Sequence, residues 1–202
     1  NKEKNSLFYD ELFQRADAYV GDIIEHINNL KLNEDTLIVI ISDHGISIGE
    51  KFGERAYGVY CYDTTLIATS LFCFPKPIKQ NYQKQVRSID ILPTILEYLS
   101  IPFDKNYREI DGKSLVPLID GDEDIRIAFS QSGNPLNSVK PPKEPNVYAI
   151  RTDDWKYIKN IHDNSQELYN LQNDPNENSN IIDSETAKLN EMRNLMDEIL
   201  SS

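Results

Sequence analysis

The sequence predicts an α/β fold in which helices flank a sheet of short strands. Three observations carry this prediction: a long amphipathic stretch near the start, two apolar runs in the middle, and two alternating segments in the last third. Apolar residues that recur every three or four positions are typical of helices. Short β-branched runs and strict alternation are typical of strands.

The first predicted element is a helix over residues 7–30. Its apolar residues recur at steps of three and four, which places them along one face of a helix. These residues are Leu12, Ala16, Val20, Ile23, Ile27 and Leu30. We expect this face to pack on the sheet.

Two apolar runs, residues 36–41 and residues 66–74, predict strands. Nearly continuous apolar strands are typical of sheets that are covered on both faces. We therefore expect the two strands to lie side by side in a largely buried sheet. Pro75 should end the second strand, because proline has no N–H to donate to a neighbour. Cys73, close to that end, is expected to behave as a small buried apolar residue.

The second half of the chain predicts two helices and a hairpin. Residues 88–99 form a helix, with Asp90 as its cap and Pro93 in its first turn. Residues 147–152 and 155–159 alternate around a short turn, which indicates a β-hairpin. The chain closes with an amphipathic helix from residue 184, whose inward positions are Leu189, Met192, Leu195 and Ile199.

Several polar residues of these elements are expected to be structural. Arg151 and Lys156, on the hairpin, are interpreted as exposed strand residues. His26, on the first helix, and His162, after the hairpin, show no spacing typical of metal ligands.

We divide the chain into three segments: an α/β part over residues 1–130, a proline-rich loop over 131–146, and a small sheet with a closing helix over 147–202. The four prolines of the middle segment predict a loop. A plain connector is favoured, and a border of a substrate cleft is the alternative.

Composition excludes some partners. The net charge is −12, which disfavours nucleic acid and anionic membranes as partners. No apolar run is long enough to cross a bilayer. Two cysteines, Cys61 and Cys73, give no disulfide framework, and no Asn-x-Ser/Thr glycosylation acceptor occurs. Both observations favour a reducing, cytoplasmic setting.

Asp43 and His44 are the candidate metal ligands. They follow directly after the predicted strand 36–41, and ligands of open α/β sheets bind at the carboxyl ends of strands. A carboxylate oxygen and a neutral imidazole nitrogen are both common ligands of divalent cations. We expect both side chains to point into one cleft there. Gly45 would leave room for a bound ion and permit a sharp turn. The simpler alternative is a loop with a helix cap.

The chain resembles the C-terminal part of the sulfatase family, within the alkaline-phosphatase superfamily. The resemblance rests on the order of several short segments along most of the chain. They are residues 8–10 (F-Y-D), 35–39 (D-T-L-I-V), 42–45 (S-D-H-G), 48–50 (I-G-E), 88–96 (S-I-D-I-L-P-T-I-L), 111–115 (D-G-K-S-L), 117–119 (P-L-I) and 167–178 (E-L-Y-N-L-Q-N-D-P-N-E-N).

The resemblance implies a fold, a metal and a nucleophile. The fold is an alkaline-phosphatase-like mixed sheet flanked by helices, here partial, with a small antiparallel C-terminal sheet. Asp43 and His44 match the family's ligands of a divalent cation. Because oxygen-rich sites suit calcium, Ca²⁺ is favoured, with Mn²⁺ or Zn²⁺ open. The nucleophile is expected upstream of this chain, as a formylglycine in a C/S-x-P-x-R motif in sulfatases.

No catalytic residue is expected within the chain itself. It begins with Asn1 and enters late in the family's order, so we interpret it as a fragment. Residues 73–77 (C-F-P-K-P) resemble C-x-P-x-R only superficially, since the final arginine is a proline and the segment follows the metal pair.

The family's lysine, which helps to hold the anionic group of the substrate, has no clear counterpart here. Arg55 or Lys51 could take its place, Arg55 by a bidentate contact and Lys51 as a point charge. A solvated loop charge is the alternative for each.

We therefore predict a fragment of a metal-dependent hydrolase of small sulfate esters. Phosphodiester, phosphonate or phosphoglycerol chemistry on the same metal frame is the first alternative, and the upstream nucleophile would discriminate the two. A non-catalytic binding module or pseudoenzyme is the alternative of another class.

Overall fold

The computed structural model describes most of the chain, and its contacts divide the chain into two compact units, residues 1–79 and 80–202. The described residues are 2–54, 56–75, 82–104, 110–119, 121–122, 124–135, 140 and 142–201. This division differs from the expected segments 1–130, 131–146 and 147–202. The reason is strand β3 (Ala128–Ser132), which spans the expected boundary and pairs with the sheet that follows it.

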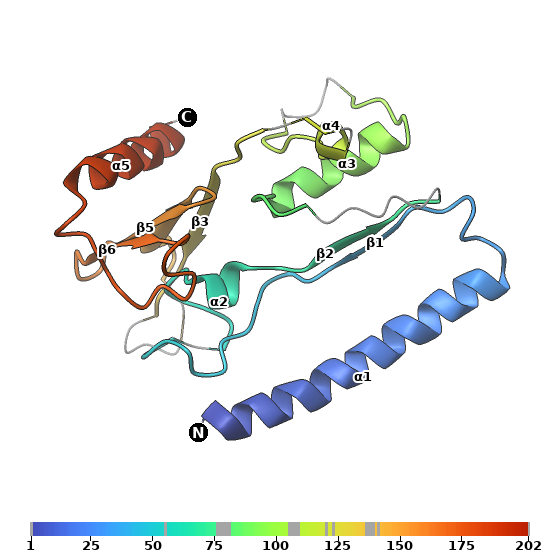
Figure 1. Ribbon diagram of the computed structural model, residues 1–202, viewed down its shortest axis with the longest axis horizontal. Coiled ribbons are helices and arrows are strands. Elements are labelled where there is room, and N and C mark those ends of the chain that lie inside the picture. The colour runs from blue at the N-terminus through green and yellow to red at the C-terminus, as the bar shows by residue number, and fades with distance from the viewer. Residues whose placement is uncertain are drawn as a thin grey trace. The chain divides into compact units, whose positions relative to one another are not determined.

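The first unit contains a long helix and a two-stranded sheet. Its elements are α1 (Lys2–Asn29), β1 (Ile38–Ile41), α2 (Asp63–Leu66) and β2 (Ser70–Cys73) (Figure 1). β1 and β2 pair in antiparallel register, with Ile38 opposite Cys73 and Ile41 opposite Ser70. The prediction that the two strands lie side by side in one sheet is therefore confirmed.

Three details of this unit differ from prediction. Residues 66–69 do not belong to a strand, because Leu66 ends α2, and an apolar run alone cannot separate a helix end from a strand. The two strands are not largely buried: Ile41 and Leu71 are exposed, and so is Cys73. β2 nevertheless ends two residues before Pro75, as expected.

The apolar stripe of α1 is exposed. The helix itself was predicted correctly, but it begins at Lys2 instead of at residue 7. Leu12, Ile23 and Leu30 are all exposed, so the predicted packing of this stripe on the sheet is wrong for this chain. Periodicity reports that a helix has an apolar face, but not which surface covers that face. None of the helices in the described part of the chain is both long and apolar enough to cross a bilayer.

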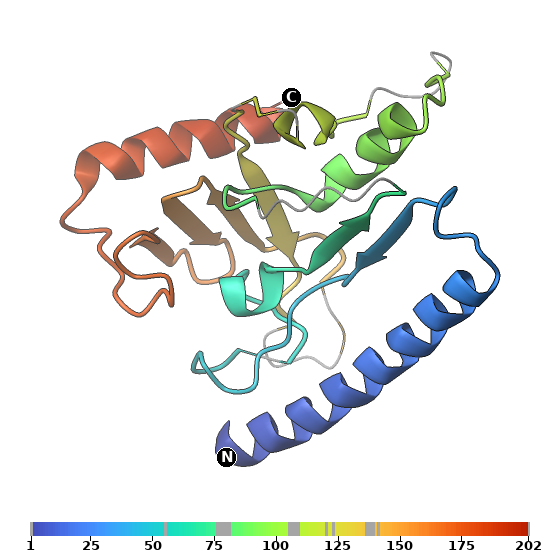
Figure 2. The ribbon, with the colours of Figure 1, turned by 45° about the vertical axis from the view of Figure 1, so that its right-hand side comes forward.

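The second unit holds a four-stranded antiparallel sheet with a helix packed on it. The strands follow in the order β3, β4 (Val147–Arg151), β5 (Trp155–Asn160) and β6 (Gln166–Asn170). Helix α5 (Thr186–Ser201) lies along this sheet (Figure 2). The predicted hairpin and closing helix are thus confirmed. Residues 136–139 and 141 of the proline-rich loop lie outside the described residues.

The core of this unit lies between α5 and the sheet. Ile150, Tyr157 and Leu168 lie side by side across β4, β5 and β6. Leu189, Met192 and Met196 of α5 cover them. The predicted inward residues Leu195 and Ile199 pack at its margin. Complete burial of side chains of this size stabilises a fold by about 1.5–3 kcal/mol each.

Lys156 and Arg151 are not exposed, contrary to prediction. Lys156 is fully buried, and its Nζ lies 2.6 Å from Oε1 of the equally buried Glu177. Arg151 is half-buried and donates a hydrogen bond to Oε1 of Gln85. The alternating pattern suggested a hairpin with one face in water. Instead, consecutive residues such as Tyr157 and Ile158 are buried, so both faces of the central strands are covered.

The start of the second unit is organised around the carboxylate of Asp90. This residue ends the short 3₁₀ turn Ser88–Asp90 and precedes α3 (Ile91–Tyr98). Contrary to the prediction, the side chain of Asp90 does not cap α3. Instead, its carboxylate lies 2.8 Å from Nη2 of Arg87 and 2.9 Å from Nη1 of Arg126, and it accepts the backbone N–H of Lys113.

A second set of contacts ties the same two segments together. Thr94 accepts the backbone N–H of Leu115 through its hydroxyl, just before α4 (Val116–Ile119). Gly112 approaches Ile89 so closely that a Cβ there would lie 1.9 Å from the carbonyl oxygen. The motifs at residues 90–94 and 111–115 therefore serve the fold.

The pKa of Asp90 follows from these contacts. Burial alone would raise the pKa of this carboxyl, but hydrogen bonds from Arg87, Lys113 and Arg126 outweigh burial and hold it below the usual 3.8. A carboxylate with a lowered pKa stabilises the folded state at pH values above 3.8, and that stabilisation is lost as the pH falls below this value.

We predict that Asp90→Asn lowers the free energy of unfolding by about 3 kcal/mol at neutral pH, because the buried Arg126 loses its fully buried counter-charge and keeps only the partly exposed Asp124. The difference from the wild type should shrink as the pH falls below 3.8. Urea unfolding followed by the fluorescence of Trp155, the only tryptophan, measures it. The control is Asp183→Asn, at an exposed position. A difference that does not change with pH would contradict the prediction.

Candidate functional site

The candidate ligands lie where β1 leaves its partner strand. Ser42 extends the contact one residue beyond β1: its N–H donates to the carbonyl of Thr69, which directly precedes β2, and its hydroxyl accepts the N–H of Thr69. Asp43 and His44 follow directly. The strand pairing ends at Ile41, so both candidate ligands lie just beyond the end of β1.

Gly45 allows the chain to approach α2. Its N–H donates to the carbonyl of Thr65 at 2.9 Å. A Cβ at this position would lie 2.5 Å from the carbonyl oxygen of Thr64 and 2.9 Å from that of Ile67. The glycine is therefore required by contact with backbone atoms. This reason differs from the room for an ion that the sequence suggested.

The geometry of Asp43 and His44 fits a shared cation. Nδ1 of His44 lies 2.6 Å from the carbonyl oxygen of Gly45. Because a carbonyl oxygen only accepts, Nδ1 carries a proton, and in the neutral imidazole Nε2 then keeps its lone pair. Nε2 lies 3.5 Å from Oδ2 of Asp43. A nitrogen lone pair and a carboxylate oxygen thus face the same space, and the backbone contact orients the imidazole as is usual for histidine ligands.

The pair is open to solvent rather than enclosed in a cleft. The Asp43 side chain is 87% exposed and the His44 side chain 35%. Among the described residues, the one hydrogen bond to Oδ1 of Asp43 comes from the backbone N–H of His44, at 3.0 Å. Within the described residues, no group of three or more His, Cys, Asp or Glu side chains is close enough to hold a metal ion. Two ligands are too few for a complete calcium site.

The loop between β1 and α2 is fixed by two carboxylates. Glu50 accepts the hydroxyl of Ser47 and the N–H of Ile48. Glu54 accepts the N–H groups of Val59 and Tyr60. These contacts hold the loop that would face a ligand at Asp43 and His44.

The two candidates for anion binding are only partly described. Nζ of Lys51 lies 5.0 Å from the centre of the Tyr62 ring, in the same loop. Arg55 lies outside the described residues. One residue beside the site was missed by sequence analysis: the ring of Tyr57 meets the ring of His44 edge to face, with centroids 5.6 Å apart. A single tyrosine in a loop carries no pattern that would reveal this.

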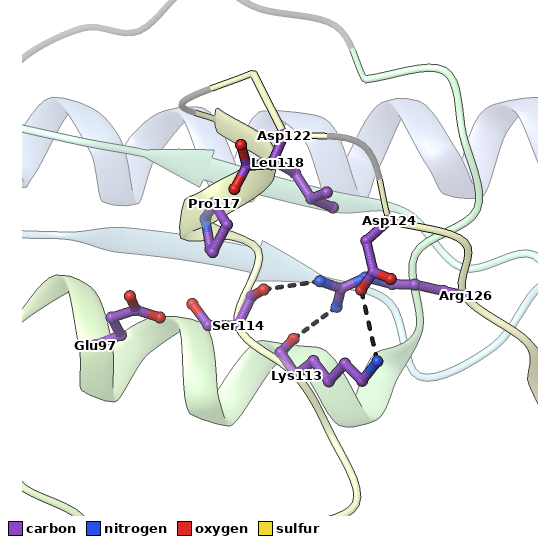
Figure 3. Close-up of a pocket in the computed structure, with 8 residues that line it drawn as sticks. All are labelled: Glu97, Lys113, Ser114, Pro117, Leu118, Asp122, Asp124 and Arg126. Carbon is purple, nitrogen blue, oxygen red and sulfur yellow. Dashed lines mark hydrogen bonds and ion pairs between the residues drawn. The ribbon is translucent and has the colours of Figure 1, made fainter.

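A cavity of about 500 Å³ lies in the second unit (Figure 3). The two cationic side chains that line it, Lys113 and Arg126, are already paired. Arg126 donates to the backbone carbonyls of Lys113 and Ser114. Oδ2 of Asp124 lies 3.8 Å from Nζ of Lys113 and 3.5 Å from Nε of Arg126. Both cations of the cavity are therefore balanced by carboxylates.

Two family models match the chain. Residues 57–202 match "N-sulphoglucosamine sulphohydrolase, C-terminal", and residues 7–101 match "Sulfatase". The chain belongs to the sulfatase family. The expected alkaline-phosphatase-like fold is confirmed as well, because its structural neighbours are sulfatases of that fold.

Individual relatives point to the same family. Arylsulfatase K of Rattus norvegicus is 31% identical over 189 residues, which are 90% of this chain and 32% of that protein. Arylsulfatase K of Canis lupus familiaris is 29% identical over 188 residues, 86% of this chain and 33% of that protein. The chain thus spans about a third of the length of these relatives.

Solved structures agree on the fold. One is the structure of a protein in complex with its substrate D-glucosamine-2-N,6-O-disulfate, with a TM-score of 0.72 and 25% identity over 92% of this chain and 38% of that one. Another is a phosphonate monoester hydrolase of Agrobacterium radiobacter, with a TM-score of 0.69, 23% identity, and coverage of 92% and 38%. At that identity the likeness to the hydrolase concerns fold alone.

We predict that Gly45→Ala displaces His44 and destabilises the first unit by about 1–3 kcal/mol. The new methyl group would clash with backbone atoms, which cannot move aside by a rotamer change as a side chain can. The imidazole resonances of the three histidines, resolved by NMR, report the displacement, and thermal unfolding reports the stability. The control is Gly21→Ala on α1, where nothing lies within 4 Å. That variant should be slightly more stable than the wild type. Unchanged His44 resonances in Gly45→Ala would contradict the prediction.

Proposed function

We propose that the chain is the C-terminal part of a metal-dependent sulfatase, a hydrolase that cleaves small sulfuric esters with water into an alcohol and sulfate. The single observation that carries the proposal is the pairing of Asp43 with His44 at the end of β1, in a chain of the sulfatase family. The nucleophile, a formylglycine in sulfatases, is expected in the part of the protein that precedes this chain.

Asp43 and His44 are proposed to supply two ligands of one divalent cation. The support is chemical: one carboxylate oxygen and one imidazole lone pair lie 3.5 Å apart, and the imidazole is oriented by the carbonyl of Gly45. Ca²⁺ is our first choice, with Mn²⁺ or Zn²⁺ as alternatives. When bound, such a cation supplies positive charge that stabilises the transferring group.

Lys51 and Arg55 remain the proposed contacts for the sulfate group. An ammonium or guanidinium group in this loop would stabilise the charge of the sulfate and hold the ester in place. The ring of Tyr62 under Lys51 supports this role, because it limits the positions that the flexible lysine can take.

Phosphoryl or phosphonate ester hydrolysis is the second candidate. The phosphonate monoester hydrolase among the structural neighbours favours keeping it, although that likeness rests on fold. The two candidates differ in the nucleophile and in the substrate. Full-length protein should cleave an aryl sulfate faster than the matching aryl phosphate or phenylphosphonate. The opposite order would favour the second candidate.

We predict that Asp43→Ala in the full-length protein removes both the bound divalent cation and turnover, because the site loses a charged oxygen ligand, the kind that hard cations prefer. Elemental analysis of the purified protein and the rate on an aryl sulfate measure the two effects. The control is Asp17→Ala, at an exposed position of α1. A variant Asp43→Ala that keeps its metal and its rate would refute the site, and the family membership would then concern fold alone.

We also predict that the isolated chain of 202 residues has no sulfatase or phosphatase turnover. It contains no C/S-x-P-x-R motif, and it offers two ligands where a hard cation needs more. Assays with 4-nitrophenyl sulfate and phosphate test turnover, and calorimetry with Ca²⁺ and Mn²⁺ tests tight binding. Turnover that survives repurification and disappears in Asp43→Ala would overturn this prediction.

A further inference from the structure

Tyr57 is an exposed aromatic residue held beside the candidate metal ligands. Its ring lies edge to face with that of His44, with the centroids 5.6 Å apart and the planes inclined by 76°. It is nevertheless 74% exposed. Within the described residues, its hydroxyl has no hydrogen-bond partner. Most of the Tyr57 side chain is therefore exposed while its ring contacts the candidate metal ligand His44.

The backbone around Tyr57 is fixed. The carbonyl of the preceding Ala56 accepts the N–H of Ser47 at 3.0 Å. Two residues beyond Tyr57, the N–H of Val59 donates to Glu54 at 2.7 Å. Gly58 has a φ of +81° and approaches the side chain of Thr65, where a Cβ would lie 2.6 Å from the hydroxyl. An aromatic side chain between such contacts loses little conformational entropy on binding a ligand.

We propose that Tyr57 contacts the organic part of the substrate and sets a preference for esters whose sulfate is carried on a ring. This inference rests on the proposed function, which places the ester at Asp43 and His44. The organic group is bonded directly to the ester oxygen of the sulfate. With the sulfate group at Asp43 and His44, the organic group would therefore lie close to His44 and to the adjacent Tyr57.

The chemistry of Tyr57 suits a ring with a flat apolar face. The face of a phenol packs against the C–H bonds of a pyranose or the face of an aryl group, and an acyclic chain offers less contact area. The hydroxyl can also donate to or accept from a neighbouring substituent of a sugar. Pyranose and aryl sulfates are therefore the two possible sources of the ring.

The same loop offers a matched control. Phe52 is fully exposed and aromatic, but it makes no ring contact in the described part of the chain. If Tyr57 acts through its place beside His44, then replacing Phe52 should not alter substrate preference. If exposed aromatic residues of the loop act only through nonspecific hydrophobic contact with the substrate, both replacements should have the same effect on substrate preference.

The test uses the full-length protein, with Tyr57→Leu, Tyr57→Phe and Phe52→Leu compared on three esters: a sulfated monosaccharide, 4-nitrophenyl sulfate and an acyclic alkyl sulfate. In Tyr57→Leu, the preference for a ring-bearing ester over the acyclic one, as a ratio of kcat/KM values, should fall about fivefold to tenfold. The change should lie in KM. Tyr57→Phe should keep the preference for the aryl ester, and lose part of it for the sugar if the hydroxyl contacts the sugar.

Two further measurements make the outcome decisive. Metal content and melting temperature of Tyr57→Leu should match the wild type, since the residue is exposed and binds no metal. A wild-type protein without turnover on any of the three esters would refute the proposed function itself. A wild-type protein that is active, while Tyr57→Leu keeps its preference or Phe52→Leu loses it equally, would overturn this inference alone.

Discussion

The carboxylate of Asp90 is the constraint on which the second unit depends. It is fully buried and pairs with two arginines from different segments, and it also accepts a backbone N–H from a third. Two charges out of water are costly, and they are tolerated only where hydrogen bonds satisfy them. Here hydrogen bonds satisfy most of these groups, and Arg126 also donates to two backbone carbonyls. The turn before α3, the segment before α4 and the approach to β3 are thereby fixed at one point.

Asp43 differs from the buried carboxylates of the second unit. In the second unit, carboxylates and cations are buried together, as in the pair of Lys156 with Glu177. In the first, the carboxylate of Asp43 is largely exposed, and within the described residues its one ion-pair contact is with the imidazole of His44. The carboxylate of Asp90 receives several donors, whereas Asp43 leaves most of its acceptor capacity to solvent. That contrast supports the proposed ligand role of Asp43, while Asp90 serves stability.

Local pattern was sufficient for elements whose pairing partners are close in sequence. The hairpin around Asp154 and the closing helix follow from alternation and periodicity, and both are present. The adjacency of Asp43 and His44 is visible in the sequence, and the structure adds the orientation of the imidazole. What sequence could not provide depends on distant partners. The burial of Lys156 requires Glu177, and the role of Asp90 requires Arg126. The close contact of Gly45 with Thr64 likewise involves a residue many positions away.

The buried ion pair of Lys156 and Glu177 should make these two positions coevolve. Each residue alone is indispensable, because loss of one leaves the other as an unbalanced buried charge, at a cost of about 3–5 kcal/mol. Together they are replaceable, since two apolar residues of similar volume can fill the same space without that cost. Sequences that diverge from this one should therefore keep both residues or exchange both. A lone change at either position marks a protein whose C-terminal sheet has lost stability.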